Sequence, residues 1–320
     1  MMKAIVLRPV EVERDFALLA TLFTLEQDEP ETEPGLKADY EQHKERIFRL
    51  SAAVDEGGEL MGFNWATRSR SNQSEAYFYV IVRPEQRRQG AGGQLYADVE
   101  QAARGCGIQK LEISVRDDCP DNLAFAMRRG FHEKTHSIGM ALNLEAFDDR
   151  PYDATIARLE AEGFRFTTME ALGNTEEAQR QLYVLNDTAA AETLGSDGSH
   201  SWLSFEDFQQ SVCQSDWYKP AGQIVAIDTA TGDWAAMSAI TRFAGADHAY
   251  NLFTGVDRRY RGRKLAQAVK VLALRYARAS LGVEMVRTNH NSKNDPMIAI
   301  DRKLGYVQTP GWYRMEKILA

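Results

Sequence analysis

The stretch from Val82 to Leu95 gathers basic residues and glycines in a spacing suited to binding a ligand. Two arginines, Arg87 and Arg88, are followed there by Gly90 and Gly92. Because glycine has no Cβ, backbone amides at these positions can approach a bulky anion closely, and the arginines add positive charge. We therefore predict that this stretch binds a polyphosphate.

A strand and a helix must position this stretch. The apolar run Tyr77–Val82 predicts a buried strand, which Pro84 ends, and a helical pattern with one apolar face follows the glycines. The first N–H groups of a helix have no partner within the helix, so its N-terminus attracts phosphate. The apolar positions of this helix are Leu95, Val99, Ala102, Ala103 and Cys106.

The glycine spacing distinguishes between phosphate-binding turns. A P-loop needs Gly-Lys-Ser/Thr, and a Rossmann turn needs a third glycine where Leu95 stands, so neither motif is present. The segment Arg87-Arg-Gln-Gly90-Ala-Gly92 instead resembles motif A of the GNAT (Gcn5-related N-acetyltransferase) superfamily, Arg/Gln-x-x-Gly-x-Gly/Ala. The alternative interpretation is an ordinary glycine-rich turn with surface arginines. The resemblance implies that acetyl-CoA is the co-substrate, held through its pyrophosphate by Val82, Arg87, Arg88, Gln89, Gly90, Ala91, Gly92 and Gly93.

The pattern occurs a second time in the chain. The segment from Val256 to Ala266 aligns with the segment from Val82 to Gly92 at a constant offset, and Gly305-Tyr306 repeats Gly130-Phe131 after one extra residue. The repeat predicts a tandem two-domain GNAT protein, with domains at 1–146 and 163–320 and a linker with a short helix at 147–162. A second possible CoA site then comprises Val256, Arg261, Gly262, Arg263, Lys264, Leu265, Ala266 and Asn294.

The resemblance also implies the fold. Each domain is expected to be α/β (α+β), with a mixed, mostly antiparallel sheet flanked by helices. The runs Arg49–Val54 and Leu60–Ala66 predict a hairpin in front of the central strand. In GNAT proteins that strand, which ends here at Val82, carries a bulge and splays from its neighbour, exposing backbone groups to the thioester.

The segment from Asp118 to Phe131 predicts a short helix that resembles GNAT motif B. In that motif a tyrosine often protonates the departing CoA thiolate. Ala126 stands at that position in the first half and Asp301 in the second, and we interpret Asp301 as a solvated helix residue. Asn294 occupies a position where the family often has asparagine. The usual general acid is therefore missing from both halves.

The reaction implied by the resemblance is attack of an amine on an acyl-CoA thioester, which requires a proton acceptor and a hydrogen-bond donor to the carbonyl oxygen. Glu75, Tyr77 and Tyr79 are close enough in sequence to the proposed site to face the acceptor, and His200 and His248 are weaker candidate bases. We predict an acyl-CoA-dependent N-acyltransferase for a small amine. The alternative is a catalytically degenerate CoA-binding sensor or scaffold.

Composition limits the remaining possibilities. The 320 residues, 44% of them hydrophobic, are enough for two domains, and the formal charge of −8 argues against a nucleic-acid surface. Three cysteines without metal-type spacing predict neither a disulfide framework nor a metal site. With no membrane span and no signal peptide, we expect a cytoplasmic monomer or homodimer. The loops after Leu25 and Leu194 are expected to choose the acceptor, and we predict that Phe205, Phe208, Trp217 and Tyr218 fill a core.

Overall fold

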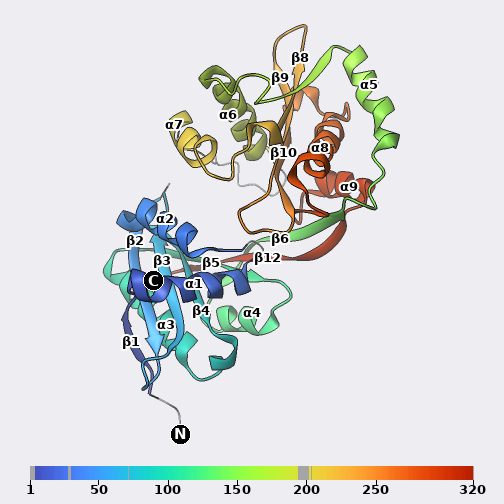
Figure 1. The fold of residues 1–320 in the computed structure, drawn as a ribbon. Helices are drawn as coiled ribbons and strands as arrows, with labels where there is room; N and C mark the ends of the chain where they lie inside the picture. Colours follow the sequence, from blue (N-terminus) through green and yellow to red (C-terminus); the bar gives the residue numbers. More distant parts are fainter. Residues whose placement is uncertain (1–3, 28–29, 71, 194–201, 203, 320) are drawn as a thin grey trace. The chain divides into compact units, whose positions relative to one another are not determined.

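The chain folds into two compact units. The computed structural model describes residues 4–27, 30–70, 72–193, 202 and 204–319. The described residues up to Lys134, together with those from Tyr313 onward, form the first unit, and Thr135–Trp312 form the second. Figure 1 shows the order of the elements along the chain. Within the described ranges, no helix is both long and apolar enough to span a membrane.

The first unit is built on a mixed sheet in the order β1-β2-β3-β4-β5, followed by the C-terminal part of β12. The neighbours from β1 to β4 pair antiparallel, whereas β4 and β5 pair parallel. This parallel pairing places corresponding ends of β4 and β5 at the same edge of the sheet. The strands are β1 (Val6–Pro9), β2 (Ile47–Val54), β3 (Leu60–Arg68), β4 (Glu75–Val82), β5 (Lys110–Arg116) and β12 (Val307–Ile318).

Helices cover both faces of this sheet. On α1 (Val12–Glu26), Phe16, Leu19 and Phe23 recur at helical spacing and pack with α2 (Glu33–His43) in one core cluster. On the other face, α3 (Ala91–Gly105) and α4 (Pro120–Met127) bury residues of a second cluster against β4 and β5. The helix that follows the arginine and glycine turn is therefore fixed to the sheet along its apolar side.

The second unit has the corresponding plan. Its sheet runs β7-β8-β9-β10-β11-β6 and then the first part of β12, and β10 and β11 are its parallel neighbours among pairs with a known register. The strands are β6 (His132–Asn143), β7 (Phe164–Thr168), β8 (Gln223–Asp228), β9 (Trp234–Thr241), β10 (Ala249–Val256) and β11 (Met285–Asn291).

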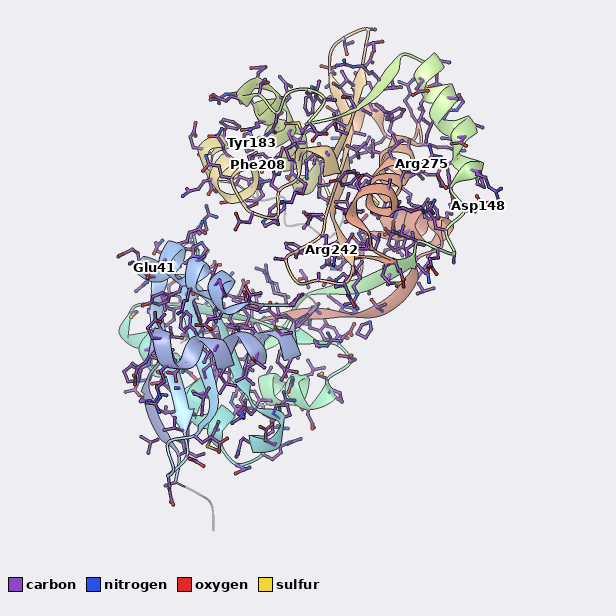
Figure 2. All side chains as sticks on the ribbon, viewed as in Figure 1. Glu41, Asp148, Tyr183, Phe208, Arg242 and Arg275 are labelled. Atoms are coloured by element: carbon purple, nitrogen blue, oxygen red, sulfur yellow. The ribbon has the colours of Figure 1, made fainter. Side chains whose placement is uncertain are left out.

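One face of this sheet carries α5 (Asp153–Ala161), α8 (Leu265–Tyr276) and α9 (Asp295–Leu304), and the other carries α6 (Glu176–Ala191) and α7 (Phe205–Phe208). Tyr183 and Phe208 point toward one another between α6 and α7, with ring centroids 5.5 Å apart (Figure 2). Phe205, Phe208 and Tyr218 are buried and Trp217 packs against the same cluster, which confirms the predicted core. Short 3-10 turns span Lys44–Arg46, Pro84–Gln86, Arg150–Tyr152, Pro220–Gly222 and Arg258–Tyr260, and π-helical turns span Gln209–Cys213 and Ala277–Leu281.

The predicted fold class is confirmed, and the structure adds that the end of the chain belongs to the first compact unit. The domain boundaries 1–146, 147–162 and 163–320 follow the sequence repeat and stay a prediction. Contacts instead assign the end of β12 to the first unit, where the Leu319 N–H donates to the Gln109 carbonyl at 2.7 Å. The last strand of the chain thus completes the sheet of the first unit.

Candidate active site

The turn between β4 and α3 takes two left-handed backbone conformations. Arg88 has φ 64° and Gly90, the N-cap of α3, has φ 100°. No side chain caps this helix start. Alternation of left- and right-handed residues turns successive N–H groups toward one side, which makes an anion-binding concavity at the positive end of the helix dipole. The structure therefore brings the predicted pyrophosphate residues, 82 and 87–93, together in one strand–turn–helix segment.

The turn between β10 and α8 repeats this backbone with the residue types exchanged. Gly262, at the position of Arg88, has φ 82°, and Lys264, at the position of Gly90, has φ 72°. Each turn thus has one glycine and one basic residue at its two left-handed positions. A lysine in this conformation is strained, because its Cβ is crowded by the backbone. The second turn keeps the backbone conformation of the first in spite of that strain.

The predicted arginines also repeat their contacts. Nε of Arg87 donates to the Val82 carbonyl at 3.0 Å, and its terminal nitrogen pairs with Glu26 at the end of α1. In the second unit Arg261 donates to the Val256 carbonyl at 3.2 Å and pairs with Glu192 at 2.6 Å. Each arginine joins the strand end to the end of the first long helix of its unit, so a carboxylate already offsets its charge.

Two other basic residues of the turns, Arg88 and Arg263, have acidic neighbours too. Arg88 pairs with Asp121 at 2.5 Å, and Arg263 pairs with Glu162 at 2.9 Å. Because these pairs lie at the surface, they are weak and solvent-screened. Backbone N–H groups are therefore available at both turns as hydrogen-bond donors to a ligand.

The parallel strands beside each turn pair over a short length and then part. Glu75, Ala76 and Tyr77 of β4 pair with residues 110–112 of β5, and β10 pairs with β11 only at residues 249–250 and 286–287. The stretch of β4 from Phe78 to Val82 therefore has β3 as a partner but not β5. The expected splay is present in both units.

The expected bulge lies in the second unit and not in β4. The β3–β4 register runs without a shift from Gly62↔Val82 to Arg68↔Ala76, so the sequence expectation for β4 is wrong. In β10 the register with β9 shifts between Asn251 and Phe253, which makes Leu252 the extra residue. The extra residue lies before Val256, whereas the motif-A alignment begins at Val256. The alignment is therefore the same with or without a bulge, and the sequence does not reveal which strand contains the bulge.

The candidate bases of the first unit lie in different surroundings. Glu75 is ion-paired with Lys110 at 2.8 Å, at the end of β4 that is still paired with β5. The ring of Tyr79 lies 5.0 Å from those of Tyr77 and Phe23, and burial, followed by the neighbouring Tyr77, raises the pKa of its phenol far above the usual range. Neither group is a free base near the turn.

The histidines singled out in the sequence do not gather with these residues. His248 is buried just before β10, and its Nδ1 lies 2.8 Å from an oxygen of Asp247. This position is at the paired end of the β10–β11 ladder, away from the turn at Val256. His200 and most of the loop after Leu194 lie outside the described residues.

Glu112 is a buried carboxylate that sequence reasoning missed. It lies on β5 opposite Tyr77, 2.7 Å from Nζ of Lys134 and 3.2 Å from Nζ of Lys110. Burial acts to raise the pKa of Glu112, but the hydrogen bonds and charges of these cations outweigh it and hold the pKa below its usual value. The Glu112 carboxylate is therefore ionised at neutral pH, and its negative charge lies where β4 and β5 begin to part.

The motif-B positions differ between the units. Ala126 is buried and offers no proton, whereas Asp301 is completely buried and contacts Lys270 and His290. The interpretation of Asp301 as a solvated helix residue is wrong, because its two partners, Lys270 and His290, lie on α8 and β11 and are not neighbours in sequence. Asn294 is the N-cap of α9, and its side chain makes no capping bond.

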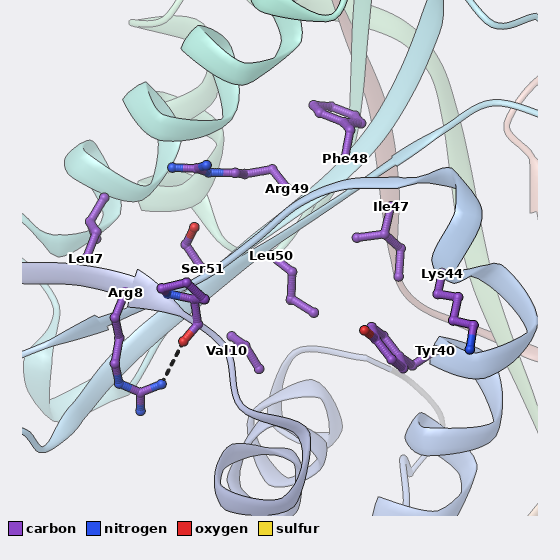
Figure 3. A pocket seen from close by; sticks show the side chains of 11 residues that line it. Leu7, Arg8, Val10, Tyr40, Lys44, Ile47, Phe48, Arg49, Leu50 and Ser51 are labelled. Atoms are coloured by element: carbon purple, nitrogen blue, oxygen red, sulfur yellow. Dashed lines mark hydrogen bonds between the residues drawn. The ribbon is translucent and has the colours of Figure 1, made fainter.

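A pocket of about 370 Å³ opens on the first unit between the start of β2 and α2 (Figure 3). Its charged lining residues are each matched by an acid: Arg8 by Asp15 at 2.7 Å and Lys44 by Glu41 at 2.7 Å. Arg49 likewise pairs with Asp98. The pocket is therefore electrically balanced and does not select an anion.

Each unit combines a mixed sheet, helices on both faces, a parallel strand pair that parts and a left-handed turn before a helix, which together define a tandem acyltransferase-like fold. Residues 16–131 match the acetyltransferase (GNAT) family. The first unit is therefore a GNAT domain, and the chain as a whole has the tandem GNAT fold.

Solved structures with the same fold cover the whole chain. A tandem GNAT protein from the clavulanic acid biosynthesis pathway has a TM-score of 0.74 at 20% identity, with 98% of each chain covered. A GCN5-related N-acetyltransferase from Sphaerobacter thermophilus has a TM-score of 0.71 at 19% identity, covering 98% of this chain and 95% of that one. A glucosamine N-acetyltransferase region of a fungal multi-domain β-N-acetylglucosaminidase has a TM-score of 0.73 at 14% identity, covering 98% of this chain and 38% of that protein. No curated protein sequence matches the chain.

Proposed function

We propose that this protein is an acyl-CoA-dependent N-acyltransferase that acts on a small amine. The observation that carries the proposal is the left-handed turn at the end of a strand that parts from its parallel neighbour, present once in each unit. The turn supplies N–H groups for a pyrophosphate, and the parted strands leave room and backbone groups for an acyl-pantetheine arm. Acetyl-CoA is the co-substrate that fits both features.

The first CoA site consists of residues 87–93 with Val82, and the second of residues 261–266 with Val256. In both, backbone donors do most of the binding, because the arginine side chains are shared with carboxylates. A ligand with two adjacent phosphates can use several N–H groups at once. This explains why the lysine at position 264 is compatible with the same role.

A direct binding test uses Gly93→Glu in the first turn of α3. A Cβ at this position lies 3.4 Å from Arg129 and requires no unusual backbone angle, and an acidic residue in the first turn favours the helix. The variant should fold and yet repel the pyrophosphate, so CoA binding measured by calorimetry should weaken at the first site. Gly105→Glu, at the other end of α3 where a Cβ meets nothing within 4 Å, is the matched control.

The reaction is tested by the release of free CoA thiol from acetyl-CoA on addition of amines, polyamines, amino sugars and aminoacyl compounds. Release with one acceptor class and formation of the matching amide support the proposal. The alternative function, a CoA-binding sensor or scaffold, is favoured by Ala126, because the first unit lacks an acid at that position. Tight CoA binding with no thiol release from any acceptor would establish that alternative.

A further inference from the structure

The second unit contains a buried cluster of charged and polar side chains from three elements. Lys270 on α8 and Asp301 on α9 have no exposed surface and form an ion pair. Nε2 of His290 on β11 lies 2.6 Å from the other oxygen of Asp301. Nζ of Lys270 lies 5.0 Å from the ring centre of Tyr306, whose buried hydroxyl has no hydrogen-bond partner among the described residues.

The first unit has a mainly apolar cluster at the same place, with no buried ion pair among its described residues, and there the Tyr96 hydroxyl accepts a hydrogen bond from Nζ of Lys317 at 2.8 Å. Counting from the N-caps Gly90 and Lys264 pairs Tyr96 with Lys270, and counting back from Gly130 and Gly305 pairs Ala126 with Asp301. The registers Ala76↔Leu111 and Ala249↔Val286 pair Val115 with His290. Tyr96, Val115, Ala126 and Phe131 all belong to one hydrophobic cluster.

The fold therefore does not need these charges. A buried ion pair is often no more stable than the apolar residues that could replace it, since both ions must leave water. Here the repeat itself supplies the apolar alternative. Charged groups that are held inside a core at such a cost are candidates for chemistry.

His290 lies where the parallel strands of the second unit have parted. The last residue of β11 that pairs with β10 is Arg287, and Thr288 donates from Oγ1 to the Asn251 carbonyl at 2.9 Å. His290 follows two residues later, on the face that also carries Thr288. Its side chain is 10% exposed, in contrast to its fully buried partners.

We propose that His290 is the proton acceptor of an acyl-transfer site in the second unit, with Asp301 as the positioning residue that fixes its ring. This inference rests on the proposed acyltransferase function. Asp301 accepts the Nε2–H bond and leaves the lone pair on Nδ1, while Lys270 keeps the carboxylate ionised. Burial acts to raise the pKa of Asp301, but the charge of Lys270 and the hydrogen bond from His290 outweigh it and lower that pKa.

The proton and electron pairs balance in this step. The acceptor ammonium gives one proton to Nδ1, and the freed lone pair forms a C–N bond to the thioester carbonyl carbon. Collapse of the adduct breaks the C–S bond, with its electron pair leaving on sulfur, and the remaining excess N–H proton goes to the thiolate. The products are the amide, the CoA thiol and an imidazolium that returns its proton to water.

The titratable surroundings of His290 are few. Asp301 reaches it from α9, and Lys270 from α8 acts through Asp301. On β6, Ile138 stands opposite His290, and His136 lies two residues further on the same face. His136 is thus the other histidine whose ionisation could be mistaken for that of His290.

The test uses the full chain with the acceptor found by the amine panel. In His290→Gln we expect kcat/KM to fall by about 10²–10⁴-fold, with CoA binding unchanged and with loss of the acid limb of the pH profile. His136→Gln should keep the limb. Thiol release that persists in His290→Gln with the same pH profile overturns this inference but leaves the proposed function intact.

A second variant separates positioning from stability. The double variant Lys270→Tyr, Asp301→Ala installs the residues that the first unit has at these two positions, so the protein should fold with an undiminished Tm. In contrast, kcat/KM should fall by about 100-fold, because the imidazole of His290 loses its orientation. An unchanged kcat/KM in this folded double variant would show that the cluster is only structural. Absence of thiol release from the wild-type protein would reject both this inference and the proposed function.

Discussion

Arg261 and Glu192 form an ion pair of 2.6 Å that ties the turn before α8 to the end of α6, and Arg87 and Glu26 form the same pair in the first unit. Both arginines are the ones expected to meet the pyrophosphate of CoA. A pyrophosphate bound as proposed would therefore compete with a glutamate for one guanidinium in each unit. Such binding would be linked to the helix end that precedes the predicted acceptor loop.

Replacement of Glu26 tests this competition. Glu26→Gln frees Arg87 for the cofactor, and we expect CoA to bind the first site about 1.5- to 5-fold more tightly, the range that a partly exposed pair of about 0.2–1 kcal/mol allows. Glu33→Gln, which removes a surface partner of Lys37 on α2, is the control. Weaker binding in Glu26→Gln would mean that the glutamate supports the site.

The phenol of Tyr79 and the carboxylate of Glu75 are predicted not to act as essential bases. A pKa raised by burial keeps Tyr79 protonated at neutral pH, so it cannot accept a proton, and Glu75 is held by Lys110. Tyr79→Phe and Glu75→Gln should each lower kcat/KM by less than about tenfold, below the usual range for loss of a general base. A loss of 10³-fold in either variant, with CoA binding retained, would restore it as a candidate.

Asp98 is predicted to hold α3 against the sheet. Its carboxylate accepts hydrogen bonds from Nε of Arg49 at 2.7 Å, Oγ of Ser51 at 2.8 Å and Nδ2 of Asn64 at 2.9 Å. Asp98→Asn leaves buried donors facing an amide, so we expect a loss of about 1–3 kcal/mol and a lower Tm. Asp118→Asn, at an exposed pair, should change stability by less than about 0.5 kcal/mol.

The pH dependence of this effect has a definite sign. Burial acts to raise the pKa of Asp98, but the bonds from Arg49, Asn64 and Ser51 outweigh it, so the folded pKa lies below the ordinary one. The carboxylate therefore stabilises the fold above the unfolded pKa of about 3.9, and this contribution is lost as pH falls through the folded pKa. The Tm difference between wild type and Asp98→Asn should shrink below about pH 4. A difference that grows in acid would refute the assignment.

Local patterns were sufficient to predict the fold class and the strand–turn–helix segments that contain the proposed CoA sites. A strand that ends at Val82, the glycines after it and the amphipathic α3 all lie within one continuous segment. Helix α2 was not predicted, because its sequence is polar and Leu36 is the single residue that it buries. The hairpin of β8 and β9 was not predicted either, because the loops of the second half give few signals of where a strand begins or ends.

The sites that were missed depend on contacts between distant residues. Glu112 is held ionised by Lys134 and by Arg314, which is just over two hundred residues away and lies in the part of β12 that joins the first unit. Lys270 sits in an amphipathic helix, where a lysine usually indicates the solvent face. A buried partner on another element reverses that inference, and no spacing rule reveals it.

Lys264 provides the last prediction, because two effects oppose each other at this residue. Its left-handed backbone is strained, and its Cβ crowds the approach of a phosphate to α8, whereas its ammonium offers a charge-assisted contact. Crowding acts on every bound pose, while the ammonium contact is weakened by solvent and salt. We therefore expect Lys264→Gly to bind CoA more tightly at the second site, in a chain that also carries Gly93→Glu so that the first site is silent. The salt dependence of binding should be shallower, because one phosphate-facing charge is gone. Calorimetry at two salt concentrations measures both quantities, and weaker binding of CoA at low salt would show that the ammonium contact dominates.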